Sequence, residues 1–234
     1  VLEGMEPWPL QTEISTSTLL PVLVFMAAGL AYKVAAAPFQ QWAPDAYDGA
    51  PISVTSFLAV FPKLAGLGAF LRVSMIMLPL ESTLGQAWHM QILLATALIS
   101  MTFGNLAGLW QDSLKRLMAY SSIAQIGYIL LGIAIGTPEG YRSAVFFIFA
   151  YIMADLAVFA VLLTLPRHDA HVNDLKGLMH QQPFLALVFM WAVLSLMGIP
   201  GTGGFLAKFT LITAGINSSR PWIVVIVVIN TVIS

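Results

Sequence analysis

The chain is dominated by long apolar stretches that are separated by short polar segments. A bilayer's hydrocarbon core is ~30 Å thick, so about 20 apolar residues are needed to cross it as a helix. Because every backbone polar group must be bonded internally in lipid, stretches of this length indicate helices. The predicted fold class is therefore an all-α, polytopic membrane helical bundle. We place about seven spans, at residues 18–37, 51–78, 89–110, 117–136, 143–165, 183–215 and from 221 onward.

Composition agrees that lipid is the main environment of the chain. Hydrophobic residues make up 59% of the 234 residues and charged residues only 9%, whereas soluble domains carry about 25% charged residues. We expect one transmembrane domain over residues 18–234, incomplete at both ends, preceded by an extramembrane loop over residues 1–17. The connections are too short for a soluble domain.

Several functions are excluded by what the sequence lacks. The formal net charge is -1, without a polybasic segment, so no nucleic-acid partner is expected. The chain has no cysteine, which excludes disulfides, thiolate catalysis and iron–sulfur ligation, and its four histidines form no metal-binding pattern. Nor does it carry a glycine-rich nucleotide loop. We therefore expect no cofactor and no metal in this chain, so redox chemistry must belong to partners.

Lysines lie where lysines are costly. In a single helix from Pro51 to Leu78, Lys63 is about 12 and 15 residues from the two ends, or roughly 18 and 22 Å at ~1.5 Å per residue. A lysine stem reaches only part of that distance toward the membrane surface. Lys208 is placed similarly within its span. Both ammonium groups therefore require a polar interior, which marks them as candidate functional residues.

Two spans are predicted to be discontinuous. The first carries Lys33 and then meets Pro38, and the sixth carries Pro200, Gly201, Gly203 and Gly204 shortly before Lys208. Proline removes a backbone donor and clashes with the preceding turn. Two broken helices with nearby lysines are typical of transporters built from inverted repeats, with the ion path at the breaks. The alternative is that these prolines only shape helix packing.

Several motifs resemble one family, the antiporter-like membrane subunits of proton-pumping NADH:quinone oxidoreductase, respiratory complex I. The likeness extends over roughly residues 20–220. Tyr47 within the first motif, together with the position of Lys63, resembles the subunit N (subunit 2) branch more than subunits L or M. The motifs are KVAAAPFQQWAPDAYDGAP (33–51), GNL (104–106), KRLMAYSSIAQIGY (115–128), LSLMGIP (194–200) and GFLAKF (204–209).

The resemblance implies a fold and a set of site residues. The family fold contains two inverted repeats, and this chain would supply about helix 7 to helix 13 of it. Lys33, Lys63 and Lys208 match the family's lysines on the hydrophilic axis along which protons move, and Lys115 matches a further lysine. The family's glutamate on helix 5 lies outside this chain. Asp155 departs from the pattern, because a small or amide residue is expected there; we include it as a tentative member of the proton path.

We therefore expect a proton-translocating subunit of a multisubunit NADH:quinone oxidoreductase. Its partners would be other membrane subunits, the lipid bilayer and protons, while NADH, FMN, iron–sulfur clusters and quinone would bind other subunits. The expected location is the bacterial inner membrane, with the thylakoid or mitochondrial inner membrane as alternatives. Related hydrogenase, coenzyme F420 dehydrogenase or ferredoxin:plastoquinone complexes, multisubunit cation/proton antiporters, and a non-conducting scaffold remain as alternative functions.

Overall fold

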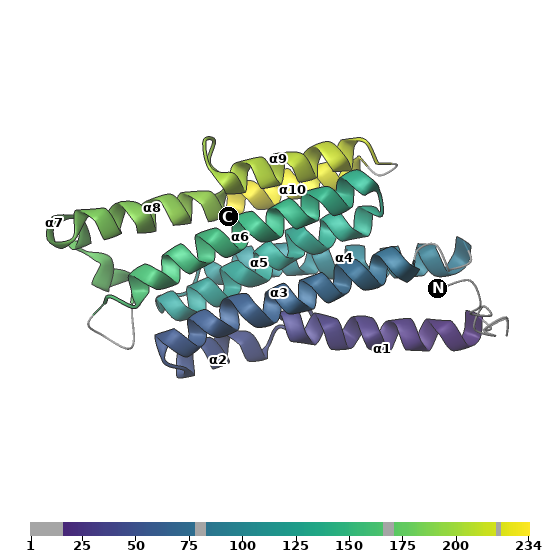
Figure 1. Cartoon of the computed structure of the whole chain (residues 1–234), viewed down its shortest axis with the longest axis horizontal. Helices are drawn as coiled ribbons and strands as arrows, with labels where there is room; N and C mark the ends of the chain where they lie inside the picture. The colour runs from purple at the N-terminus through teal and green to yellow at the C-terminus, as the bar shows by residue number, and fades with distance from the viewer. Residues whose placement is uncertain (1–15, 78–82, 166–170, 219–220) are drawn as a thin grey trace, which may run out of the picture.

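The computed structural model describes residues 16–77, 83–165, 171–218 and 221–234. Its elements over these ranges are helices, which confirms the predicted all-α class, and Figure 1 shows their arrangement. In chain order they are α1 (Thr16–Val34), α2 (Trp42–Gly49), α3 (Ile52–Met77), α4 (Thr83–Gly108), α5 (Leu114–Ile135), α6 (Pro138–Leu162), the 3-10 helix η1 (Val172–Leu175), α7 (Leu178–Gln181), α8 (Pro183–Met197), α9 (Gly203–Ile216) and α10 (Trp222–Ile233).

Membrane-spanning length is reached by four of the described helices. Their apolar stretches are Ile52–Met75, Met90–Gly108, Leu114–Ile135 and Pro138–Leu162. Shorter apolar helices cover Val24–Val34, Pro183–Met197, Gly203–Ile216 and Trp222–Ile233. These segments are the ones that hydropathy predicted as spans.

Helix boundaries differ from the predicted ones where a polar side chain begins a helix. The sequence predicts starts at 117 and 143, but α5 and α6 begin earlier because Ser113 and Thr137 act as N-caps. Helix α1 begins at Thr16, so the predicted loop over 1–17 ends sooner, and its residues 1–15 lie outside the described part. The stretch predicted over 183–215 consists of two helices, α8 and α9.

Helix α5 is the centre of the bundle. It contacts α2, α3, α4, α6 and α9, and in Figure 1 it runs between α3 and the pair α9 and α10. Most of its residues are buried, including the polar side chains of Lys115, Ser122 and Gln125. These polar groups on α5 are therefore enclosed by protein, and their partners have to come from α5 itself or from neighbouring helices.

Helices α4 and α5 pack closely because glycines lie at their contact. A Cβ atom added at Gly127 would lie 2.6 Å from the backbone nitrogen of Met101, and one added at Gly104 would lie 2.5 Å from that of Ala124. Backbone atoms cannot move aside as the end of a flexible side chain can. This close approach follows the use of small residues between membrane helices.

Substituting alanine for Gly127 is expected to separate α4 from α5 and to lower stability by about 1–3 kcal/mol, the usual cost of overpacking. The thermal unfolding midpoint of the purified protein measures this. Gly68→Ala on α3 is the matched control, because nothing lies within 4 Å of a Cβ atom there. An unchanged midpoint for Gly127→Ala would contradict the packing described above.

Candidate functional site

Lys63 lies inside the bundle, on α3, with 1% of its surface exposed. Its Nζ donates a hydrogen bond to Ser122 Oγ on α5 and lies 5.0 Å from the ring centre of Tyr47 on α2. Ser122 Oγ in turn donates to the carbonyl oxygen of Ala119 at 2.6 Å. A hydroxyl and an aromatic face thus surround the ammonium group, and both can stabilise a cation.

Asp155, on α6, is also 1% exposed. Its Oδ2 is buried without a hydrogen-bond partner among the described residues. Tyr151, one turn earlier on α6, donates to the carbonyl oxygen of Ala59 on α3 at 3.4 Å. Asp155 thus lies on a helix that packs against the α3 helix of Lys63.

Tyr47 lies on α2, whose position beside Lys63 depends on the backbone between α1 and α2. Helix α1 ends at Val34, and Ala35 has a positive φ of 59°. The backbone that follows is bonded by side chains, since the Ala37 N–H donates to Ser100 Oγ on α4 at 2.8 Å. Thr55, in the first turn of α3, donates through its Oγ1 to the carbonyl oxygen of Tyr47 at 3.0 Å. These bonds replace the helical ones that irregular backbone lacks in lipid.

Lys115, at the start of α5, is buried and bonds the end of α2. Its Nζ donates to the carbonyl oxygens of Asp48 and Ala50, the latter at 3.3 Å. Beside it, Arg116 pairs with Asp45 at 3.1 Å, and Ser113 Oγ donates to Asp48 Oδ1 at 2.7 Å. A cation at the C-terminal end of a helix compensates the unbonded carbonyls and the helix dipole. Lys115 thus fixes α2, and with it Tyr47, against α5.

A methionine at position 115 is expected to loosen α2, because hydrogen bonds to a charged donor contribute about 1.5–3 kcal/mol. The expected result is a lower thermal midpoint of the purified protein and faster backbone hydrogen exchange over α2. Lys176→Met is the control, since Lys176 is exposed and follows η1. Equal midpoints and equal exchange in the two variants would argue against this role of Lys115.

Lys208, on α9, is 2% exposed and lies at the end of α8. Its Nζ donates to the carbonyl oxygen of Met197, the last residue of α8, at 2.8 Å, and lies 4.8 Å from the ring centre of Tyr128 on α5. Gly198 ends α8 with φ 84°, and a Cβ atom there would lie 2.8 Å from Cδ of Lys208. Glycine is thus required both by the backbone and by the lysine stem.

The residues between α8 and α9 bring the chain back against itself. Gly201 has φ 95°, and Pro200 is exposed. Gly203 begins α9, while the N–H of Gly204 donates to Ser195 Oγ on α8 at 3.0 Å. A Cβ atom at Gly204 would collide with the carbonyl oxygen of Ser195. The start of α9 is therefore held against the last turns of α8.

Three of the predicted lysines meet α5. Lys115 belongs to it, Lys63 bonds Ser122, and Lys208 lies over Tyr128. At ~1.5 Å per residue these three positions are spaced by roughly 10 and 9 Å along the helix. Gln125, between them, donates to the carbonyl oxygen of Leu196 on α8 at 2.9 Å. Such spacings exceed a direct hydrogen bond, so proton exchange between the lysines needs intervening water or side chains.

Lys33 differs from the other three lysines. It lies in the last turn of α1, close to Gly66, which follows Lys63 by about one turn of α3. However, its side chain is exposed, as is Pro38, which follows a cis peptide bond at Ala37. The structure therefore brings Lys33 near the α3 helix of Lys63 but does not enclose it with the Lys63 cluster.

Two hydroxyl-bearing neighbours of Lys63, Tyr47 and Ser122, are not predicted as site residues, because the sequence presents them only as parts of motifs. They come from α2 and α5, and their common partner is on α3. Identifying them requires knowing which helices pack together, and a single sequence does not provide that.

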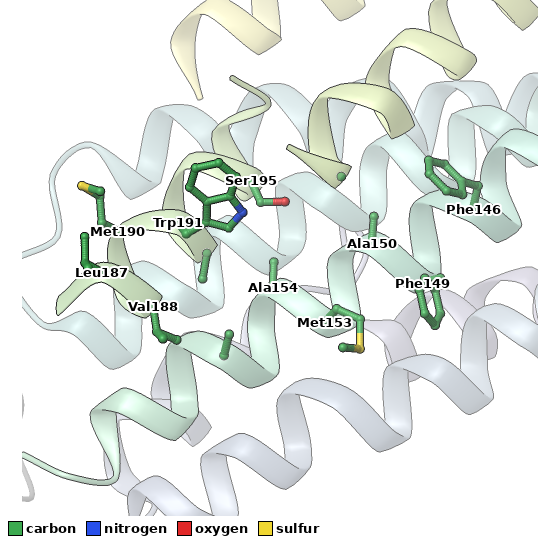
Figure 2. Close-up of a pocket in the computed structure, with 13 residues that line it drawn as sticks. Phe146, Phe149, Ala150, Met153, Ala154, Leu187, Val188, Met190, Trp191 and Ser195 are labelled. Atoms are coloured by element: carbon green, nitrogen blue, oxygen red, sulfur yellow. The ribbon is translucent and has the colours of Figure 1, made fainter. Parts of the chain in front are cut away.

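An apolar groove of about 740 Å³ lies apart from this cluster, between α6, α8 and the start of α9. Figure 2 shows Phe149, Met153 and Trp191 among its lining side chains. None of the residues described as lining it carries a charge. The groove therefore suits hydrocarbon.

Comparisons with known proteins match almost the whole chain to one family. Residues 8–234 match the model of the family described as NADH:quinone oxidoreductase/Mrp antiporter, TM. The chain is 40% identical over 215 residues to NADH-quinone oxidoreductase subunit N of Pelagibacter ubique, covering 91% of this chain and 45% of the relative. It is 41% identical over 224 residues to subunit N of Rhodospirillum rubrum, covering 94% and 45%.

A solved structure supports the same fold. A chain of respiratory complex I from Thermus thermophilus with bound Aureothin superposes with a TM-score of 0.80 at 31% identity, covering all of this chain and 49% of that chain. The chain thus spans less than half the length of the curated relatives named above. Together with the apolar helices, these likenesses identify a multi-pass membrane protein.

Proposed function

Because the chain belongs to the NADH:quinone oxidoreductase/Mrp antiporter transmembrane family, we propose that it translocates protons as part of a subunit of a multisubunit NADH:quinone oxidoreductase. The observation that carries this proposal is the line of buried lysines along α5. Lys63 and Lys208 are almost fully enclosed, yet each is held by a hydrogen bond and an aromatic ring. Ionisable groups at this depth usually belong to an ion or proton pathway.

The proposed path runs from Lys33 and Lys63 past α5 to Lys208, with Lys115 as a further member. Three of these lysines lie at the C-terminal end of a helix. Lys33 is in the last turn of α1, Lys115 bonds the end of α2, and Lys208 bonds the end of α8. A helix end stabilises a cation without a full counter-charge, so the lysine can release its proton without breaking an ion pair. Water between the lysines would complete the transfer steps.

The helix pairs α1 with α2 and α8 with α9 form, in this proposal, the two discontinuous spans of an inverted-repeat transporter. Their support is the irregular backbone at Ala35 and from Gly198 to Thr202, where side chains from neighbouring segments bond the free backbone groups. On this basis residues 18–234 form one transmembrane domain, which we assign to the bacterial inner membrane.

Redox groups belong to partner subunits in this proposal. Iron–sulfur clusters require cysteine thiolates, and the chain has none. NADH, FMN, the clusters and quinone would therefore bind elsewhere in the complex, while the side chains of this chain hold and pass protons. Electron transfer in those subunits would act on this one through contacts between membrane subunits.

The test separates an oxidoreductase subunit from a cation/proton antiporter, the second function that the family description includes. The full-length protein in its complex is reconstituted into sealed vesicles, and lumen pH is followed with a fluorescent dye. NADH with a quinone is expected to drive proton uptake, and a sodium gradient without NADH is not. Proton movement driven by the sodium gradient alone would overturn the proposal in favour of the antiporter.

A further inference from the structure

A second apolar groove, of about 720 Å³, lies between the end of α3 and the start of α6. Met75 of α3 lines it together with residues of α6, among them Tyr141, Arg142, Phe146 and Phe149. Unlike the groove between α6 and α8, it has a charged lining residue, Arg142, and none of its described lining residues is acidic. A groove that is apolar along its length and positively charged near the start of α6 suits an amphipathic anion.

A second arginine, Arg72, lies at the same end of this helix pair. The Tyr151 hydroxyl of α6 donates to the carbonyl oxygen of Ala59 on α3 at 3.4 Å. Met75, further along α3, shares the groove with Arg142, which lies nearer the start of α6. The two helices are therefore antiparallel. Arg72 precedes Met75 by about one turn, and both arginines are exposed, so two guanidinium groups lie near one end of the pair.

Neither arginine has a protein counter-charge among the residues that the structure describes. The ion pairs formed there involve Arg116, and neither Arg72 nor Arg142 takes part in a hydrogen bond within those ranges. Glu139, one turn before Arg142, is exposed and does not line the groove. Tyr141, which does line it, has a buried hydroxyl oxygen without a described hydrogen-bond partner. The groove therefore offers positive charge that no described acidic side chain compensates.

The depth of the two arginines matches that of lipid headgroups. At ~1.5 Å per residue, Arg142 lies roughly 6 Å from Pro138, the first residue of α6, and Arg72 lies roughly 8 Å from Met77, the last residue of α3. An arginine side chain can extend over much of such a distance to the membrane surface. There its guanidinium group can bind a phosphate through two parallel hydrogen bonds.

The apolar surface continues from Arg142 along α6. Phe146 and Phe149 line this groove and also the one that Met153 lines, so the two grooves adjoin, and Figure 2 shows these three side chains on α6. From Arg142 to Met153 the helix rises roughly 16 Å at ~1.5 Å per residue. This is about half of the ~30 Å hydrocarbon core. A lipid held at Arg142 by its phosphate can therefore place an acyl chain of one leaflet along this surface.

We propose that the groove between α3 and α6 binds an anionic phospholipid of the phosphatidylglycerol type. Its phosphate accepts hydrogen bonds from Arg142 and Arg72, and an acyl chain lies over Phe146 and Phe149. A zwitterionic lipid carries its own cation beside the phosphate, so it gains less from the two arginines. The site lies on the exposed side of α3 and α6, whereas Lys63 is buried. It is therefore independent of the proposed proton path.

The test uses the full-length protein in its complex, in nanodiscs of equal parts phosphatidylglycerol and phosphatidylcholine. A trace of either lipid carries a photoactivatable diazirine on its acyl chain, and mass spectrometry measures labelling of residues 142–153. The phosphatidylglycerol probe is expected to label this segment preferentially. Arg142→Gln should lower that preference about fivefold, the contribution of one basic residue near anionic lipid, and Arg142→Lys should retain most of it. Lys176→Gln is the control, because Lys176 is exposed and follows η1.

Equal labelling by the two probes in wild type would overturn the proposal. Absence of labelling of residues 142–153 by either probe would also overturn it, because protein would then cover the groove. This comparison needs no variant, so it decides the question even if Arg142→Gln fails to assemble. An unchanged preference in the assembled double variant Arg72→Gln, Arg142→Gln would show that the headgroup is held elsewhere and would equally contradict the proposal. None of these results depends on proton uptake, so they leave the proposed function untouched.

Discussion

Replacing Lys63 by methionine is expected to slow proton transfer through this subunit by roughly a hundredfold or more, the loss typical of removing a proton-transfer group, so that NADH-driven uptake loses the share that this subunit carries. The reason is that Lys63 is bonded to Ser122 of α5 and lies over the ring of Tyr47 inside the bundle. Methionine fills a similar volume in the same hydrophobic surroundings but carries no proton. Quenching of a pH-sensitive dye in vesicles that contain the full-length protein in its complex measures the effect.

Two further variants show whether the effect is specific to the position of the charge. Lys176→Met removes a lysine from the exposed segment after η1 and should leave uptake at the wild-type level. Ser122→Ala removes the oxygen that accepts from Lys63 and should give an intermediate loss. Wild-type uptake by an assembled Lys63→Met complex would contradict the role of Lys63.

Replacing Lys208 by methionine is expected to produce the second large effect, a fall of roughly a hundredfold in the rate of proton transfer. Lys208 bonds the carbonyl oxygen of Met197 and lies over Tyr128, so its loss removes the proton-holding group at the junction of α8 with α9. A pH electrode records proton uptake while NADH oxidation is followed by absorbance in the same sample.

Its control is Phe209→Leu, because Phe209 neighbours Lys208 on α9 but is exposed. That variant should pump normally if the effect belongs to the ammonium group and not to disturbance of α9. A ratio of protons to electrons equal to wild type in Lys208→Met would place Lys208 outside the path.

Hydropathy was sufficient to predict most of the fold. The predicted spans 51–78 and 89–110 overlap most of α3 and α4, because long apolar stretches leave a chain in lipid few choices besides a helix. The starts of α5 and α6 were less well predicted, since they depend on caps at Ser113 and Thr137 that lie outside the apolar stretches. A hydropathy profile does not detect the N-cap of a helix.

The candidate site was predictable only in part. Counting along the apolar stretches placed Lys63 and Lys208 deep in the membrane, and the structure buries both. The capping contact of Lys115 with α2 and the bond of Lys63 to Ser122 on α5 depend on which helices pack together. Lys33 is exposed in the described structure. Contacts between distant helices have no signature in a single sequence, so these three outcomes required the structure.

The central claim is that protons cross through the buried lysines, and the number of protons taken up per quinone reduced tests it most directly. The measurement compares vesicles containing wild type with vesicles containing the double variant Lys63→Met, Lys208→Met, at equal amounts of assembled complex. The account predicts that the double variant takes up fewer protons per quinone than wild type, by the share that this subunit carries. An identical ratio in the two preparations would contradict it.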